Sequence, residues 1–141
     1  MPKEQNKSKG ARNRTADVDA SLARPGGLSY LEIPVTDARQ SAIFYQKVCG
    51  WKIEERAADD WRFADPSGHL IGSWKIGRAI SRRPGLLPFI YVNGIRKAVE
   101  QVAKYGGEVV KAPYPEGNLL VAVVRDPAGN VIGLWEVAPH H

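Results

Sequence analysis

The chain of 141 residues is long enough for one domain with its own core, and its 43% hydrophobic and 25% charged residues are ordinary for a globular protein. This composition excludes collagen, coiled coils and wholesale disorder, and no apolar run approaches the roughly 20 residues of a membrane-spanning helix. The formal net charge is +5, and residues 1–26, with six basic and three acidic side chains, contribute +3 of it.

Residues 1–26 carry few large apolar side chains, and we expect them to form a flexible basic tail before a domain over residues 27–138. The tail lacks the interleaved aromatic residues on which single-stranded nucleic acids stack, so no nucleic-acid partner is expected. It also lacks the apolar run of a secretory signal, and the single cysteine, Cys49, cannot form an internal disulfide. We therefore expect a cytoplasmic protein without a membrane partner.

One short motif occurs twice in the chain. DPSGHLIGSW at 65–74 and DPAGNVIGLW at 126–135 share Asp, Pro, Gly, Ile, Gly and Trp at matching places, 61 residues apart. A weaker match upstream places Val35 on Val92, an offset of 57. A repeat of about 60 residues is too long for a solenoid unit, so the sequence predicts a duplicated module. The two copies cover about residues 27–83 and 84–138.

The same succession of elements is predicted in both copies. In the first, an apolar strand is followed by Thr36 and Asp37, which suit the start of a helix, and Gly50 suits its end. The first copy has elements at 28–35 (strand), 38–49 (helix), and 51–56, 61–64 and 69–76 (strands). The second has them at 87–92 (strand), 95–105 (helix), and 108–111, 119–125 and 131–137 (strands). The predicted fold class is therefore α+β, with two β-α-β-β-β modules.

Two such modules, with a DP-x-G-x-x-I-G-x-W ending in each, resemble the vicinal oxygen chelate superfamily of glyoxalases, bleomycin-resistance proteins, fosfomycin-resistance transferases and extradiol dioxygenases. The residues that carry the resemblance are 32–37, 44–45, 50–51, 106–107 and 125–136. The resemblance implies a cup-shaped mixed sheet with the helices on its convex side. It also implies a homodimer, since relatives with two modules commonly pair and exposed sheet edges favour pairing.

The alternation of side chains along each strand then predicts which residues face into the cup. These are five aromatic residues and one acid: Tyr30, Trp74, Phe89, Tyr91, Trp135 and Glu32. Such a lining suits a small, flat or apolar ligand, including a cationic one. The alternative is that some of these rings merely fill the core.

Glu32 is the candidate catalytic residue and also a candidate ligand-binding residue. A buried carboxylate needs a partner, and no inward lysine, arginine or histidine is predicted on the same strands. We therefore expect a tyrosine hydroxyl or a ligand amine to pair with Glu32. The alternative is that Glu32 reaches solvent at the mouth of the cup.

The metal ligands of enzymes in the superfamily would fall, by this resemblance, near Tyr30, Gly72, Leu87 and Gly133. These side chains offer at most one phenol, so we expect no metal and no other cofactor. His69 follows a turn and is expected to point away from the cup.

Three classes of function remain open at this point. The first and favoured class is a metal-free protein of the glyoxalase and bleomycin-resistance type that binds a small molecule. The second is a lyase, isomerase or dioxygenase that uses Glu32 as a base or a metal ligand. The third is an interaction protein whose cup is filled and whose tail binds the partner.

Overall fold

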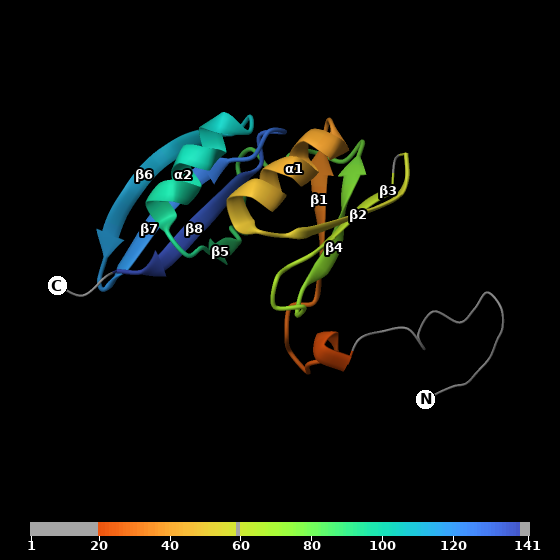
Figure 1. Cartoon of the computed structure of the whole chain (residues 1–141), viewed down its shortest axis with the longest axis horizontal. Helices are drawn as coiled ribbons and strands as arrows, with labels where there is room; N and C mark the ends of the chain where they lie inside the picture. Colours follow the sequence, from red (N-terminus) through yellow and green to blue (C-terminus); the bar gives the residue numbers. More distant parts are fainter. Residues whose placement is uncertain (1–19, 59, 139–141) are drawn as a thin grey trace.

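Two four-stranded sheets, each with one helix packed on it, make up the part of the chain described by the computed structural model, residues 20–58 and 60–138 (Figure 1). The first half contains β1 (Tyr30–Val35), α1 (Ala38–Cys49), β2 (Lys52–Ala57), β3 (Asp60–Ala64) and β4 (Ile71–Ile76). The second contains β5 (Phe89–Tyr91), α2 (Ile95–Lys104), β6 (Glu108–Glu116), β7 (Leu119–Arg125) and β8 (Val131–Val137).

The strand order is the same in both sheets, β1-β4-β3-β2 in the first and β5-β8-β7-β6 in the second. In each sheet the first strand of the module runs parallel to the last, and the other neighbours run antiparallel. The predicted α+β fold of two β-α-β-β-β modules is therefore confirmed.

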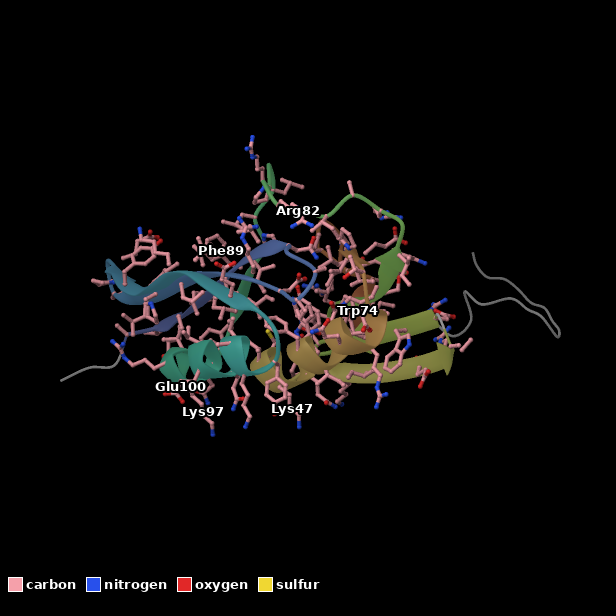
Figure 2. All side chains as sticks on the ribbon, turned by 90° about the horizontal axis from the view of Figure 1, so that it is seen from above. Lys47, Trp74, Arg82, Phe89, Lys97 and Glu100 are labelled. Carbon is pink, nitrogen blue, oxygen red and sulfur yellow. The ribbon has the colours of Figure 1, made fainter. Side chains whose placement is uncertain are left out.

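Both helices cover one side of the sheets, and residues 77–88, which connect β4 to β5, lie on the other side (Figure 2). In Figure 2, Lys47 and Lys97 project on the helix side, whereas Arg82 and Phe89 lie on the opposite side. We call this second side the open face and residues 77–88 the linker.

The two helices begin in different ways. At α1 the side chain of Asp37 accepts a hydrogen bond from the backbone N–H of Gln40 at 3.1 Å, and Gly50 ends the helix with a left-handed φ of 76°. The first turn of α2 has no cap from its own N-cap residue, Gly94. The Glu136 carboxylate on β8 replaces it, accepting hydrogen bonds from the backbone N–H groups of Gly94 at 3.1 Å and Ile95 at 2.8 Å. Glu136 thus has a structural role.

The core lies between the helices and the sheets, and it receives every second residue of the central strands. Ile33 and Val35 of β1 and Ile132 and Leu134 of β8 are buried, as the alternation predicts. Their neighbours Tyr30, Phe89 and Tyr91 point away from the core and are 45–52% exposed. The predicted facing of β1, β5 and β8 is therefore correct.

The two repeated turns differ by one residue in length. Ala64 pairs with Ile71 across the first turn, which leaves the six residues 65–70 unpaired. Arg125 pairs with Val131 across the second turn, which leaves the five residues 126–130 unpaired. A shift of one residue turns every following side chain to the other face of a sheet. As a result, Gly72 and Trp74 face the helices, whereas the matching residues Gly133 and Trp135 face away from them.

The second turn also joins the two modules through a buried polar network. Asp126 Oδ1 accepts hydrogen bonds from three backbone N–H groups of its own turn, and Oδ2 accepts from the Tyr45 hydroxyl of α1 at 2.7 Å and from Asn130 Nδ2 at 2.8 Å. Asn130 Nδ2 also donates to the carbonyl oxygen of Pro34 at 2.8 Å, and its Oδ1 accepts from the linker N–H of Ser81 at 2.8 Å. These bonds hold β1, α1, the linker and β8 together.

The predicted flexible tail falls mostly on residues 1–19, which lie outside the described residues. Its last part, residues 20–26, includes a 3-10 helix, Ala20–Leu22. The Ser21 hydroxyl donates to the carbonyl oxygen of Gly68, and Arg24 donates to that of His69. The described part of the chain contains no helix long and apolar enough to cross a membrane.

Candidate functional site

A cavity of about 310 Å³ lies where β1 of the first sheet meets β5 and the start of β8 in the second. We call it the central cavity. Its lining is mostly apolar and comes from both modules and the linker: Leu28, Leu31, Glu32, Ile33, Pro34, Tyr45, Trp51, Leu70, Ser81, Leu86, Pro88, Phe89, Ile90, Asn130, Val131 and Ile132. Neither module forms this cavity alone.

Glu32 lines the central cavity, but its partner is not the one predicted. The carboxylate Oε1 lies 2.6 Å from Nη1 of Arg78 in the linker, and the Glu32 side chain is 32% exposed. The predicted tyrosine partner is wrong, because the Tyr30 hydroxyl instead lies 3.2 Å from the Ser73 hydroxyl on β4. Strand alternation could not indicate this partner, because Arg78 lies in the linker and not on a strand.

Phe89 is the other predicted residue that lines the central cavity. Its ring lies over Gly133 of the neighbouring strand, where any Cβ would collide with it. Phe89 is 49% exposed, so this ring is positioned by the sheet without being buried in the core.

Tyr91 and Trp135 lie next to each other, outside the lining of the central cavity. Their ring centroids are 5.0 Å apart at 76°, an edge-to-face pair, and Tyr91 is 52% exposed. Tyr91 also borders another hollow of about 370 Å³ between the end of α1 and the start of α2, which we call the helix groove. The helix groove includes Lys47, Lys97 and Gln101.

Trp74 does not face the cup, and its predicted role in the lining is wrong. The side chain is 2% exposed and packs against Tyr45 and Phe63, with ring centroids 6.2 Å and 4.9 Å away. The longer first turn explains the error, since it reverses the face of β4 relative to β8. The indole N–H of Trp74 is buried and has no hydrogen-bond partner among the described residues.

Tyr30 lies on the open face of the first sheet, apart from the central cavity. It lines a hollow of about 270 Å³ whose other members include Lys52, Glu54, Arg56 and Arg62. The open face of the first sheet is thus charged around Tyr30. The predicted ring of five aromatic residues is therefore divided among the central cavity, the helix groove, the charged face and the core.

Several cavity-lining residues were not predicted from the sequence. Leu86 and Pro88 belong to the linker, and Leu86 is 91% exposed. The adjacent residues Leu86 and Leu87, at the end of a polar loop, were the feature of the sequence that could have indicated an apolar wall here. Trp51 stacks between Tyr45 and Phe63, with centroids 4.7 Å and 4.5 Å away, and gives the cavity an aromatic floor.

Two titratable groups of α1 are held neutral, Tyr45 in the lining of the central cavity and Cys49 in that of the helix groove. Burial, and then the neighbouring Asp126 carboxylate, raises the pKa of Tyr45 well above its ordinary value. Burial raises the pKa of the Cys49 thiol to about 12. The thiolate is the reactive form of cysteine, so Cys49 is poorly suited to act as a nucleophile at neutral pH.

The residues at the positions expected for a metal do not fit a divalent cation. Tyr30 offers a phenol that is hydrogen-bonded to Ser73, and Gly72, Leu87 and Gly133 offer no ligand atom. The nearby Glu32 carboxylate is paired with Arg78. In residues 20–58 and 60–138, no three or more His, Cys, Asp or Glu side chains gather where they could hold a metal ion.

Comparison with known proteins agrees with this architecture. Residues 30–135 match a family model described as a glyoxalase-like domain. No curated protein matches the sequence significantly.

Three solved structures illustrate the similarity of fold. A glyoxalase/bleomycin resistance protein/dioxygenase family enzyme from Burkholderia phytofirmans is 22% identical, with a TM-score of 0.63, over 77% of this chain and 97% of that one. The fosfomycin resistance protein FosX from Mesorhizobium loti is 16% identical, with a TM-score of 0.63, over 81% and 92%. A mutant FosX from Listeria monocytogenes, complexed with Mn(II) and 1S,2S-dihydroxypropylphosphonic acid, is 17% identical, with a TM-score of 0.63, over 77% and 87%.

Proposed function

Because this chain belongs to the glyoxalase-like domain family, we propose that residues 27–138 form a binding domain that holds a small, flat or apolar molecule in the central cavity. The observation that carries the proposal is the cavity itself, which is walled by both modules and floored by aromatic rings. The proposed binding needs no metal, since the donor atoms around the cavity do not suit one.

The size and chemistry of the central cavity support a compact ligand. Its volume of about 310 Å³ lies at the lower end of the range of roughly 300–1,000 Å³ for small-molecule sites. The half-exposed Phe89 ring offers a flat surface for stacking, and Leu28, Leu31 and Leu86 offer apolar contacts. Two or three fused rings would suit this volume.

The predicted catalytic role of Glu32 stays a prediction. Glu32 faces the cavity and is paired with Arg78, an arrangement that supports recognition of charge at the cavity wall. Phe89 and Glu32 are the ligand-binding residues on which this proposal rests. Tyr30, Tyr91 and Trp135 would contribute only if the ligand extends along the open face.

The exposed rings of the open face also support the homodimer expected from the resemblance. Tyr30, Phe89 and Tyr91 are 45–52% exposed, and a second copy would remove part of this apolar surface from water. Light scattering at tens of micromolar would then give twice the chain mass of 15.5 kDa. A mass of one chain would contradict the dimer and leave the binding proposal standing.

The binding proposal is tested by calorimetric titration with acridine, a flat three-ring probe, at a pH where it is neutral. We expect saturable binding with one site per chain, and a loss of about tenfold or more in Phe89→Ala, because stacking on an aromatic face is worth about 1–3 kcal/mol. Tyr114→Ala, which removes a ring of β6 that does not line the central cavity, is the matched control and should bind as the unmodified protein does. Equal affinities of the two variants, or no binding of acridine, would contradict the proposal.

A further inference from the structure

Glu32 carries the single formal charge among the described residues that line the central cavity. The remaining lining is apolar or aromatic apart from the side chains of Ser81 and Asn130 and the hydroxyl of Tyr45. Two of these polar groups already have partners, since the Tyr45 hydroxyl donates to Asp126 and Asn130 bonds to Pro34 and Ser81. A ligand therefore meets one strong, charged acceptor in the cavity, the carboxylate of Glu32.

The present partner of that carboxylate is exchangeable. Arg78 reaches Glu32 from the linker, and its side chain is 51% exposed while that of Glu32 is 32% exposed. Ion pairs with this much access to water contribute little to stability, because solvent competes for both charges. Arg78 does not itself line the cavity, so it can move into solvent without opening the cavity wall.

Arg82, another cation of the linker, is engaged at the second turn. The Arg82 guanidinium lies against Gly129 in the second turn, where an added Cβ would stand 2.7 Å from its Nη1. In addition, the carbonyl oxygen of Arg82 accepts a hydrogen bond from Arg125 at 3.3 Å. These contacts hold this part of the linker over β8 and leave Arg78 as the cation paired with Glu32.

We propose that the ligand of the central cavity is a flat organic cation, whose positive group replaces the Arg78 guanidinium at Glu32 while its ring stacks on Phe89. This inference rests on the proposed function and specifies its ligand class. Aromatic faces attract cations as well as apolar rings, so Phe89 and Glu32 favour the same ligand. A carboxylate also binds a ligand N–H⁺ more strongly than a neutral acceptor does, and it fixes the orientation of the ring.

The test compares three probes of one shape by calorimetry at neutral pH: 9-aminoacridine as the cation, acridine as the neutral ring and acridine-9-carboxylate as the anion. We expect 9-aminoacridine to bind about tenfold or more tightly than acridine, since hydrogen bonds to charged groups are worth more than neutral ones. Glu32→Gln should abolish this preference, so that the variant binds 9-aminoacridine and acridine with similar affinities. Arg78→Ala should strengthen binding of the cation by about two- to fivefold, the value of an exposed ion pair.

The chain offers a matched control pair, Glu54 and Arg56 on β2. They form an exposed ion pair at 3.3 Å and do not line the central cavity. Glu54→Gln and Arg56→Ala should therefore leave all three affinities unchanged. Similar effects in Glu54→Gln and Glu32→Gln would overturn the proposal, because they would reflect net charge and not a specific carboxylate.

The outcomes separate this inference from the proposed function. Equal affinities for the three probes, or tightest binding of acridine-9-carboxylate, would overturn the cation inference while leaving a binding cavity. Failure of all three probes to bind would instead contradict the proposed function itself. Retention of the cation preference in Glu32→Gln would overturn the assignment of Glu32 as the recognition group.

Discussion

The two copies of the DP-x-G-x-x-I-G-x-W motif have nearly the same residues and opposite orientations. In the first copy, Gly72 makes room for the ring of Phe63, which is 3% exposed, and Trp74 is buried beside it. In the second copy, Gly133 makes room for the ring of Phe89, which is 49% exposed and lines the central cavity. The matching glycines thus make room for a core ring in one module and for a ring of the central cavity in the other.

One residue of turn length accounts for this difference. Side chains alternate along a strand, so the longer first turn sends Gly72 and Trp74 to the helix side, while the shorter second turn sends Gly133 and Trp135 to the open face. The turns also differ in their contacts. Asp65 bonds within its own turn, whereas Asp126 reaches Tyr45 in the other module. The two copies of the motif therefore differ in structure through turn length and the partners of one aspartate.

The largest expected effect comes from shifting β4 by one residue beyond the first turn. Deletion of Gly72 keeps the pair of Ala64 and Ile71, so it directs Ser73 and Lys75 toward the core and Trp74 to the open face, where Trp135 lies in the second module. We expect loss of cooperative unfolding in urea and of the near-ultraviolet circular dichroism of the buried rings. Deletion of Gly85, an exposed linker residue with no atom within 4 Å of a Cβ added there, is the control and should retain both. A stable Gly72 deletion with unchanged spectra would contradict the role of this one-residue shift.

The two tryptophans provide the next comparison. Trp74→Ala should lower the free energy of unfolding by about 3–5 kcal/mol, because it leaves a cavity in the core. Trp135→Ala should cost less, about 1.5 kcal/mol, since it removes a partly buried ring and its pair with Tyr91. Urea titrations of the two variants measure both values. Equal losses would mean that the two rings do not lie in different environments.

A smaller difference is expected for the two turn aspartates. Asp126→Ala should lower the free energy of unfolding by about 3 kcal/mol, because it leaves the buried Tyr45 hydroxyl and backbone N–H groups without their acceptor. Asp65→Ala should cost about 1 kcal/mol, since its bonds to Ser67 and Leu70 are close to solvent. Unfolding in urea measures the free energy lost in each variant. A larger loss for Asp65→Ala than for Asp126→Ala would contradict the role of the buried hydrogen bonds of Asp126 in holding the modules together.

The smallest effect concerns alkaline pH and belongs to the first module alone. The Cys49 pKa rises from 9.0 to about 12 on folding, so the folded state retains the thiol proton. The stability from this protonated thiol is therefore present below pH 9 and is lost as the pH rises from 9 toward 12. At pH 10 the loss should be about 1.4 kcal/mol, the value of one pKa unit. Cys49→Ala should reduce the fall in the free energy of unfolding between pH 9 and pH 12, measured by urea titration. An unchanged fall in this variant would contradict the assignment to Cys49.

The sequence predicted most of the fold because the fold depends on local patterns. Repeated turns, apolar alternation and the glycine that ends α1 indicated both modules and the facing of β1, β5 and β8. The facing of β4 could not be read from the same pattern, since it depends on how many residues the first turn leaves unpaired. The partner of Glu32 was also missed, because Arg78 reaches it through the path of the linker and not through strand alternation.

The position of the ligand tests the central claim most directly. Nuclear magnetic resonance of isotope-labelled protein can follow every backbone amide during titration with 9-aminoacridine. We predict that the shifted signals belong to residues 28–34, 86–90 and 130–132, which surround the central cavity between the modules. Shifts confined to residues 47–50 and 93–101, at the helix groove, would contradict the account.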